Sequence, residues 1–212
     1  MAFRIRLATV GDREKISEHV REFFRRDEPL SRYLKLSELC DKKEDKPPEE
    51  NKKQEVSVVA TDEFSNIIGV SLNELVHKDD PNVPFTCSNS EIQKIVDLID
   101  HIEGIVDVFN KYPNVNSVLH IHVLSVAPTW RRKNLAAELI NETRKIANQV
   151  SASLIQMECT SYYSAQLALK LNFHCIYQKK YTDYLVNGKQ MFFPEHPHEE
   201  IGVYVQHLNK DQ

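Results

Sequence analysis

A buried strand that runs straight into a basic turn and then into a helix is the feature that most constrains this chain. Residues 118–126 (VLHIHVLSV) are apolar and rich in β-branched side chains, which is typical of a strand inside a sheet. Pro128 ends that strand because proline has no amide hydrogen to donate to a neighbouring strand. Apolar residues at helical spacing begin at Leu135 and continue through Leu139. The sequence therefore predicts a strand–turn–helix unit.

Three cationic residues fill the turn between this strand and the helix: Arg131, Arg132 and Lys133. The first amides of a helix have no partners within the helix, and the helix dipole places partial positive charge at the same end. A basic first turn opposes that dipole, so a bound anion is favoured there. We therefore predict a phosphate-binding site; the alternative is an amphipathic helix whose basic end is solvated.

Length and composition are those of one soluble globular domain spanning residues 1–212. The net charge of −4 argues against a nucleic-acid partner, and we expect neither a signal peptide nor a membrane-spanning segment. The cysteines have neither metal-binding nor redox spacing, which favours a cytoplasmic protein with free thiols. They are Cys40, Cys87, Cys159 and Cys175.

The periodicity of apolar residues predicts strands that alternate with helices. Strands are expected at residues 3–7, 56–61, 67–76, 118–126, 154–158, 173–181 and 201–207. Helices are expected after Thr9, from Pro29, at 90–112, from Leu135 and at 161–171. This order predicts an α/β fold of three layers, with a mixed central sheet flanked by helices on both faces.

Capping and charge patterns add detail to this layout. Asp27 is expected to cap the helix that starts at Pro29, and Ser88 with Glu91 has the spacing of a capping box. Residues 41–55 are almost wholly charged and contain two prolines, so we expect a mobile surface loop there.

The basic turn resembles the acetyl-CoA motif of the GCN5-related N-acetyltransferases, the GNAT superfamily. That motif is Arg or Gln, two residues, Gly, one residue, then Gly or Ala, and here it runs from Arg131 to Ala136. Asn134 occupies the first glycine position, and asparagine is the residue that best tolerates φ > 0 after glycine. The resemblance implies a GNAT fold that binds acetyl-CoA with the strand end and the turn. The residues implied are Leu124, Ser125, Val126, Arg131, Arg132, Lys133, Asn134, Leu135 and Ala136.

Several separated segments resemble a narrower group, the insect arylalkylamine N-acetyltransferases that acetylate dopamine and serotonin. They cover nearly the whole chain in the right order: residues 23–30 (FFRRDEPL), 98–103 (LIDHIE), 124–126 (LSV), 161–165 (SYYSA), 170–173 (KLNF) and Pro197-His198. This resemblance implies direct transfer of an acetyl group from acetyl-CoA to a small primary amine such as dopamine, serotonin or tyramine. We expect a monomer that needs no metal. The alternatives are a polyamine, agmatine or protein amine substrate, or a non-catalytic acyl-CoA-binding module.

The same resemblance implies roles for polar side chains. Glu28 corresponds to the general base, although a glutamate there could instead interact with a helix dipole. Ser164 is implied in stabilising the thiolate leaving group and Thr160 in orienting the substrate, with helix capping as the alternative for both. Asn172 replaces a second family glycine, before Phe173.

Two further sets of residues complete the predicted site. His120 and His122 lie two apart, so both project from one face of the strand. A vertebrate branch of the superfamily uses a similar His-x-His to relay protons, and a structural role is the equal alternative. Metal binding is not expected, because no third ligand is evident at suitable spacing. Aromatic side chains expected to bind the substrate are Phe24, Tyr33, Tyr162 and Tyr163.

Overall fold

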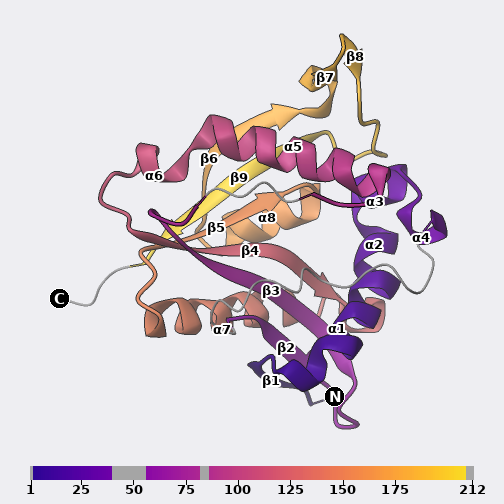
Figure 1. Cartoon of the computed structure of the whole chain (residues 1–212). Coiled ribbons are helices and arrows are strands. Elements are labelled where there is room, and N and C mark those ends of the chain that lie inside the picture. The colour runs from indigo at the N-terminus through magenta and orange to yellow at the C-terminus, as the bar shows by residue number, and fades with distance from the viewer. Residues whose placement is uncertain (1, 40–55, 82–85, 209–212) are drawn as a thin grey trace.

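A mixed seven-stranded sheet forms the centre of the structure, a computed structural model that describes residues 2–39, 56–81 and 86–208 (Figure 1). The strand order is β1-β2-β3-β4-β5-β9-β6, and every neighbouring pair is antiparallel except β4 with β5. The strands are β1 (Arg4–Leu7), β2 (Val58–Thr61), β3 (Ile67–His77), β4 (Ser117–Val126), β5 (Leu154–Cys159), β6 (His174–Lys180) and β9 (Glu200–His207). A separate two-stranded hairpin consists of β7 (Leu185–Val186) and β8 (Lys189–Gln190).

Helices cover both faces of this sheet, which confirms the predicted three-layer α/β fold (Figure 1). One face carries α7 (Leu135–Gln149) and α8 (Tyr162–Lys170), and the other carries α1 (Arg13–His19), α5 (Ser90–Val106) and α6 (Val108–Lys111). Short helices α2 (Arg25–Asp27), α3 (Pro29–Tyr33) and α4 (Leu36–Leu39) follow α1. In the described part of the chain, no helix has both the length and the apolar character required to cross a membrane.

Alternating side chains along the strands form the two apolar layers. Leu119 and Ile121 of β4 face α7, where they pack in one cluster with Leu139 and Ile140. Val59 of β2 faces the opposite way and packs with side chains of the N-terminal helices. This period of two is the pattern expected of a sheet buried on both faces.

Helix boundaries depart from the prediction at two places. Asn89 caps α5 by accepting bonds from the amides of Glu91 and Ile92 (2.9 and 3.2 Å), so the predicted Ser88 capping box is wrong by one residue. That helix ends at Val106, since Asp107 adopts a left-handed conformation (φ 36°) and α6 begins after it. The predicted single helix over 90–112 is therefore two helices. The predicted charged loop at 41–55 lies outside the described residues.

Strand β4 contains a bulge at the level where its pairing with β5 ends. Leu72 pairs with Val123, whereas Asn73 pairs with Ile121, so His122 is an extra residue in β4. The parallel pairing of β4 with β5 ends at the same level, with Ile121 opposite Met157. Bulges increase the local twist of a strand. Beyond this point β4 stays paired with β3 but has no paired residues on β5, so β4 and β5 separate.

Candidate active site

The basic turn after β4 has the backbone conformation that the sequence predicted. Asn134 is the N-cap of α7 and is left-handed, with φ 66° and ψ 4°. Its side-chain amide donates to Glu138 Oε1 (3.1 Å). Arg132 is also left-handed (φ 59°), which shows that the turn needs positive φ at two positions. The first amides of the 15-residue helix α7 follow directly.

Arg131 joins this turn to the segment that carries Glu28. Its Nε donates to the Val126 carbonyl at the end of β4 (2.9 Å), and its Nη2 pairs with Asp27 Oδ2 (2.5 Å). The ammonium of Lys133 lies 5.1 Å from the centre of the Trp130 ring. Asp27 also binds Arg26 Nε (2.8 Å), and these two cations lower its pKa.

Ser125, near the end of β4, contacts a histidine that the sequence reasoning missed. His19 is buried, and its Nδ1 lies 3.2 Å from the Ile67 carbonyl while its Nε2 lies 3.2 Å from Ser125 Oγ. Nδ1 must donate to the carbonyl, so Nε2 accepts from the serine hydroxyl. Burial lowers the pKa of His19, which favours this neutral form. Its only sequence signal is a place near the apolar face of the first helix.

Glu28, and not Asp27 as predicted, caps α3. Glu28 Oε1 accepts from the amide of Leu30 (3.1 Å), and its Oε2 accepts from the amide of Ser31 (2.6 Å). Its side chain has the reach to fold back over Pro29, while Asp27 is held by arginines. Thr160 Oγ1 donates to Glu28 Oε1 as well (2.8 Å). A carboxylate has about four acceptor positions, so hydrogen bonds from the described residues use three and leave one on Oε2.

Thr160 and Ser164 therefore differ in their surroundings. Thr160 follows β5 and contacts Glu28, and its carbonyl accepts from the Tyr181 hydroxyl (2.7 Å). Ser164 belongs to a capping box at the start of α8, where Ser161 Oγ accepts from the amide of Ser164 (3.0 Å). The hydroxyl of Ser164 donates back to the Ser161 carbonyl (2.9 Å). The structure brings Thr160 to Glu28 and engages Ser164 in the helix start.

The predicted aromatic residues belong to the helical segments next to Glu28 and Thr160. The Phe24 carbonyl accepts from the amide of Glu28 (2.7 Å), and Tyr33 lies 6.0 Å from Phe193 between ring centres. Tyr162 and Tyr163 form a pair 5.7 Å apart at the start of α8 and are 47% and 67% exposed. Sequence reasoning did not single out Phe193, which is 56% exposed and lies after β8.

Solved structures of this architecture are known. The structure resembles arylalkylamine N-acetyltransferase 2 from Aedes aegypti with a TM-score of 0.86, 24% identity and coverage of 99% of this chain and 100% of that chain. It resembles the Drosophila melanogaster polyamine N-acetyltransferase that forms N-acetylagmatine with a TM-score of 0.79, 24% identity and coverage of 98% and 100%. It also resembles the C-terminal condensation domain of Ebony in complex with β-alanyl-dopamine, with a TM-score of 0.76, 15% identity and coverage of 98% of this chain and 100% of that chain.

This chain has the GNAT fold. In this chain the fold contains three features of the candidate site: the separation of β4 from β5, the bulge at His122 and the basic turn before α7. No protein-family model matches the sequence. At 24% identity the likeness establishes the fold, so the chemistry has to be argued from the residues of the site.

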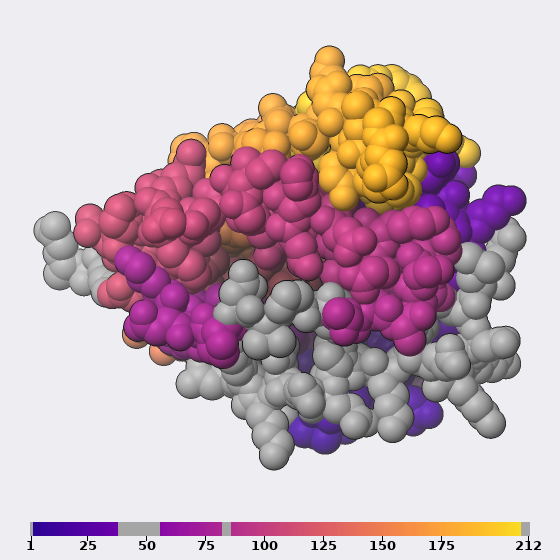
Figure 2. Space-filling view, turned by 45° about the horizontal axis from the view of Figure 1, so that its top comes forward, coloured from indigo at the N-terminus to yellow at the C-terminus, as the bar shows by residue number. Residues whose placement is uncertain are grey.

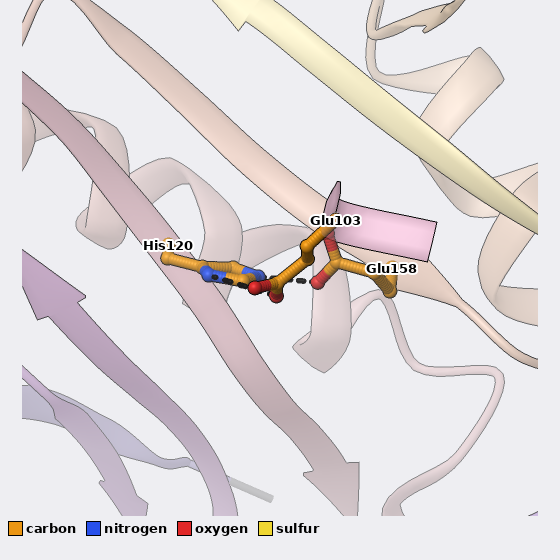
Figure 3. A group of neighbouring side chains, drawn as sticks. All are labelled: Glu103, His120 and Glu158. Atoms are coloured by element: carbon orange, nitrogen blue, oxygen red, sulfur yellow. Dashed lines mark hydrogen bonds and ion pairs between the residues drawn. The ribbon is translucent and has the colours of Figure 1, made fainter. Parts of the chain in front are cut away.

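The two predicted histidines lie in a cluster of carboxylates on the α5 face of this GNAT sheet. His120 Nε2 is hydrogen-bonded to Glu158 of β5, and its Nδ1 lies 3.8 Å from Glu103 of α5 (Figure 3). His122 Nε2 lies 3.1 Å from Glu74 of β3, and the two imidazole centres are 4.1 Å apart. Four separate elements thus contribute to one group of charged side chains.

Charges in this cluster shift one another's pKa values. Burial alone would lower the pKa of His120, but the charge and hydrogen bond of Glu158, with help from Glu103 and Glu74, raise it to about 9. Burial raises the pKa of Glu103 to about 7, against the opposing charge of His120. Burial acts in the same direction on Glu158, but His120 outweighs it and lowers the pKa of that carboxyl. At neutral pH His120 is therefore a cation between carboxyl groups.

Two members of the cluster are partly exposed beside α5, the helix that crosses this side of the molecule in Figure 2. The side chains of His122 and Glu103 are 44% and 38% exposed. Desolvation nevertheless lowers the pKa of His122 and raises that of Glu103. These two side chains form the exposed edge of the cluster, whereas the side chains of His120 and Glu158 are buried.

From sequence spacing alone, no third metal ligand was expected beside the two histidines. In the folded chain Glu103, His120 and Glu158 each offer one ligand atom, and these atoms lie within 4.8 Å of one another. Glu103 and Glu158 are separated from His120 by 17 and 38 positions, so only the fold brings the three together.

Proposed function

We propose that this protein is an acetyl-CoA-dependent N-acetyltransferase that acetylates a small primary amine, with arylalkylamines such as dopamine, serotonin or tyramine as the favoured class. The observation that carries the proposal is the carboxylate of Glu28. It is buried, held by Thr160 and two backbone amides, and keeps one acceptor position for an incoming amine or water. The resemblance of residues 23–30 to the insect enzymes supports the same assignment.

Acetyl-CoA fits the opposite side of the opening between β4 and β5. The turn from Arg131 to Ala136 offers full positive charges and the unpaired amides of α7 to the pyrophosphate. The backbone of Leu124, Ser125 and Val126 lies beyond the end of the β4–β5 pairing, where pantetheine and the thioester would bind. Arg131 contacts both this backbone and Asp27, so it connects the two halves of the site.

The reaction is direct attack within a ternary complex. Glu28 accepts the proton of the ammonium group, directly or through a water molecule, because a primary amine with a pKa of about 10 is protonated at neutral pH. The amine nitrogen then attacks the thioester carbon. Collapse of the tetrahedral intermediate breaks the C–S bond, and the nitrogen loses its second proton to water. The thiolate leaves with a proton supplied by a nearby hydroxyl, for which we propose Ser164, and that hydroxyl regains a proton from water.

The geometry favours Glu28 over His120 as the base. Both ring nitrogens of His120 face carboxyl groups, and the raised pKa keeps the ring protonated at neutral pH. His120 therefore has no lone pair with which to accept the amine's proton. We propose a structural part for His120 and His122, which is one of the two roles that the sequence left open. Phe24, Tyr33, Tyr162 and Tyr163 are proposed to contact the aromatic part of the substrate.

Release of free CoA from acetyl-CoA tests this function. The acceptors are tyramine, dopamine and serotonin, with agmatine and putrescine as polycationic rivals and a peptide with a free amino terminus as the protein-type rival. Preference for the arylalkylamines is expected, since exposed aromatic rings lie on the helices that follow Glu28 and Thr160. Calorimetric binding of acetyl-CoA without release of CoA on any acceptor would establish a non-catalytic module instead.

A further inference from the structure

The cluster on the α5 face contains donor atoms that suit a metal ion and that the acetylation chemistry does not use. Glu103 comes from α5, His120 from β4 and Glu158 from β5, and all three side chains point toward one another (Figure 3). Their nearest ligand atoms lie within 4.8 Å of each other. We propose that Glu103, His120 and Glu158 form a binding site for a divalent transition-metal ion of the zinc class. This proposal does not rest on the proposed acetyltransferase activity.

The distances are compatible with coordination of one ion. Zinc binds imidazole nitrogen and carboxylate oxygen at about 2.0–2.2 Å, so two donors of one ion are at most about 4.2–4.4 Å apart. The ligand atoms of Glu103, His120 and Glu158 lie within 4.8 Å of one another, so small side-chain rotations bring them to these distances. The direct hydrogen bond between Nε2 of His120 and Glu158 leaves no room for an ion, so Glu158 has to move back as Glu103 moves in. The side chain of Glu103 is 38% exposed, which leaves it room to rotate.

The ring of His120 lies between the two carboxyl groups of the proposed site. Its Nδ1 is 3.8 Å from Glu103 Oε1, and its Nε2 is hydrogen-bonded to Glu158. Zinc is usually four-coordinate, so a water molecule would supply the fourth ligand.

Burial and charge favour a cation at this position. The side chains of His120 and Glu158 are only 7% and 5% exposed, and Glu74 adds a third carboxyl group near the two histidines. The cluster thus holds three carboxyl groups against two imidazoles in a desolvated place. Carboxylates that are removed from water need paired cations or a metal, and one divalent ion supplies the missing charge.

A buried amide beside the cluster gives independent support. Gln156 is 4% exposed and donates from Nε2 to Glu158 Oε1 (2.8 Å), so its amide lies against the proposed ligand. Its Oε1 is buried and has no hydrogen-bond donor among the described residues. A buried polar atom without a partner is rare and marks places where water or an ion binds. A water molecule on the metal would donate to this oxygen.

Binding is an exchange of a proton for the metal and involves no redox change. The hydrogen on Nε2 of His120 leaves to solvent, and the freed lone pair coordinates the ion together with the Glu103 and Glu158 oxygens. The ion would join α5 to both central strands beside the point where β4 and β5 separate. We therefore expect metal to stabilise the fold at the edge of the opening.

Titration of the full-length, chelator-treated protein with Co²⁺ and Zn²⁺ tests the site. Calorimetry should show one ion per chain, and Glu103→Gln and Glu158→Gln should each weaken binding about 10- to 100-fold or more. Glu91→Gln is the matched control, since it is the same substitution on the same helix at its distant end, and its binding should equal wild type. At zinc 100-fold above Kd, Tm should rise by about 5–10 °C.

The absorption spectrum of the Co²⁺ complex distinguishes binding at this site from binding by cysteine thiolates elsewhere in the chain. Nitrogen and oxygen ligands give no thiolate-to-cobalt charge-transfer band, so that band should be absent. Because Glu103 is on an accessible helix face, Glu103→Gln remains informative if Glu158→Gln does not fold. Three results would each overturn the proposal: no metal binding by wild type, binding unchanged in folded Glu103→Gln, or a thiolate band. Binding of putrescine, and not of zinc, at these residues would assign the cluster to an organic diammonium ion and overturn it too.

Discussion

The basic turn before α7 and the carboxylate network around Glu28 are the two sides of the proposed active site, but they are built in different ways. The turn consists of consecutive residues, and its key property is the backbone conformation of Asn134 (φ 66°). The Glu28 network joins side chains 132 positions apart, since Thr160 donates to a carboxylate near the N-terminus. A site made from local backbone is therefore visible in the sequence, whereas a site made from distant side chains depends on how strands are ordered.

The largest expected effect tests the network side of this comparison. Glu28→Gln keeps the size of the side chain but removes its ability to accept a proton. General-base contributions are typically about 10²–10⁴-fold, so kcat/KM at pH 7 should fall by about that factor. Glu22→Gln, an exposed neighbour in the same helical segment, is the matched control and should match wild type. Because Gln also disturbs the cap of α3, Tm has to show that the variant is folded.

Removal of two positive charges, those of Arg131 and Lys133, tests the basic turn before α7. Arg131→Ala with Lys133→Ala should weaken acetyl-CoA binding about 10- to 100-fold and reduce its salt dependence, because two charge-assisted contacts to phosphate are lost. The control removes the same number of charges elsewhere, with Lys145→Ala and Lys170→Ala. Calorimetry at two salt concentrations measures both effects. Equal affinity in the two double variants would make the turn a solvated helix end.

A smaller effect is expected from loss of the hydrogen bond between Thr160 and Glu28. Thr160→Val removes the hydroxyl that donates to Glu28 Oε1 (2.8 Å), and a hydrogen bond to a charged group contributes about 1.5–3 kcal/mol. We expect kcat/KM to fall about tenfold or somewhat more, since 1.4 kcal/mol corresponds to a factor of ten. Thr160→Ser keeps the hydroxyl and should restore most of the rate. A wild-type rate in folded Thr160→Val would show that the hydrogen bond to Glu28 does not matter.

The smallest effect concerns the backbone of the turn. Asn134→Ala should destabilise the protein by about 1 kcal/mol relative to Asn134→Gly, because alanine in the left-handed region carries a cost that glycine does not. Asn134→Gly should bind acetyl-CoA with equal or slightly higher affinity. Urea unfolding of the two variants measures the difference in stability. If alanine is tolerated as well as glycine, the left-handed turn does not constrain this position.

Most of the sheet and its helices could be predicted because each element has its own apolar period. The strand–turn–helix at residues 117–149 and the capped helix α8 follow from residues that are neighbours in the chain. Helix caps were harder, because Asp27 and Glu28 are both acceptable before Pro29. Arg131, more than 100 residues away, binds Asp27 and leaves Glu28 to cap the helix.

The remaining site residues could not be found from spacing. Glu158 and Glu103 have no sequence relation to His120, and the parallel β4–β5 pairing with α5 above it brings them together. The bulge at His122 has no residue signature either, although it lies where the pairing of β4 with β5 ends. His19 reaches Ser125 only through the packing of the first helix on β4. Without such a relation, charged residues on strands and helices are expected to face solvent, so Glu103 and Glu158 were not predicted as site residues.

The pH dependence of Glu28→Gln shows whether Glu28 removes the proton of the amine. The ratio of kcat/KM between wild type and this variant should be measured with tyramine from pH 6 to 9. We expect a ratio that is large at pH 6–7 and shrinks as pH rises toward the pKa of the amine, about 10, because more substrate then arrives already neutral. A ratio near one throughout this range, in a folded variant, would rule out Glu28 as the base and leave it as a helix cap alone.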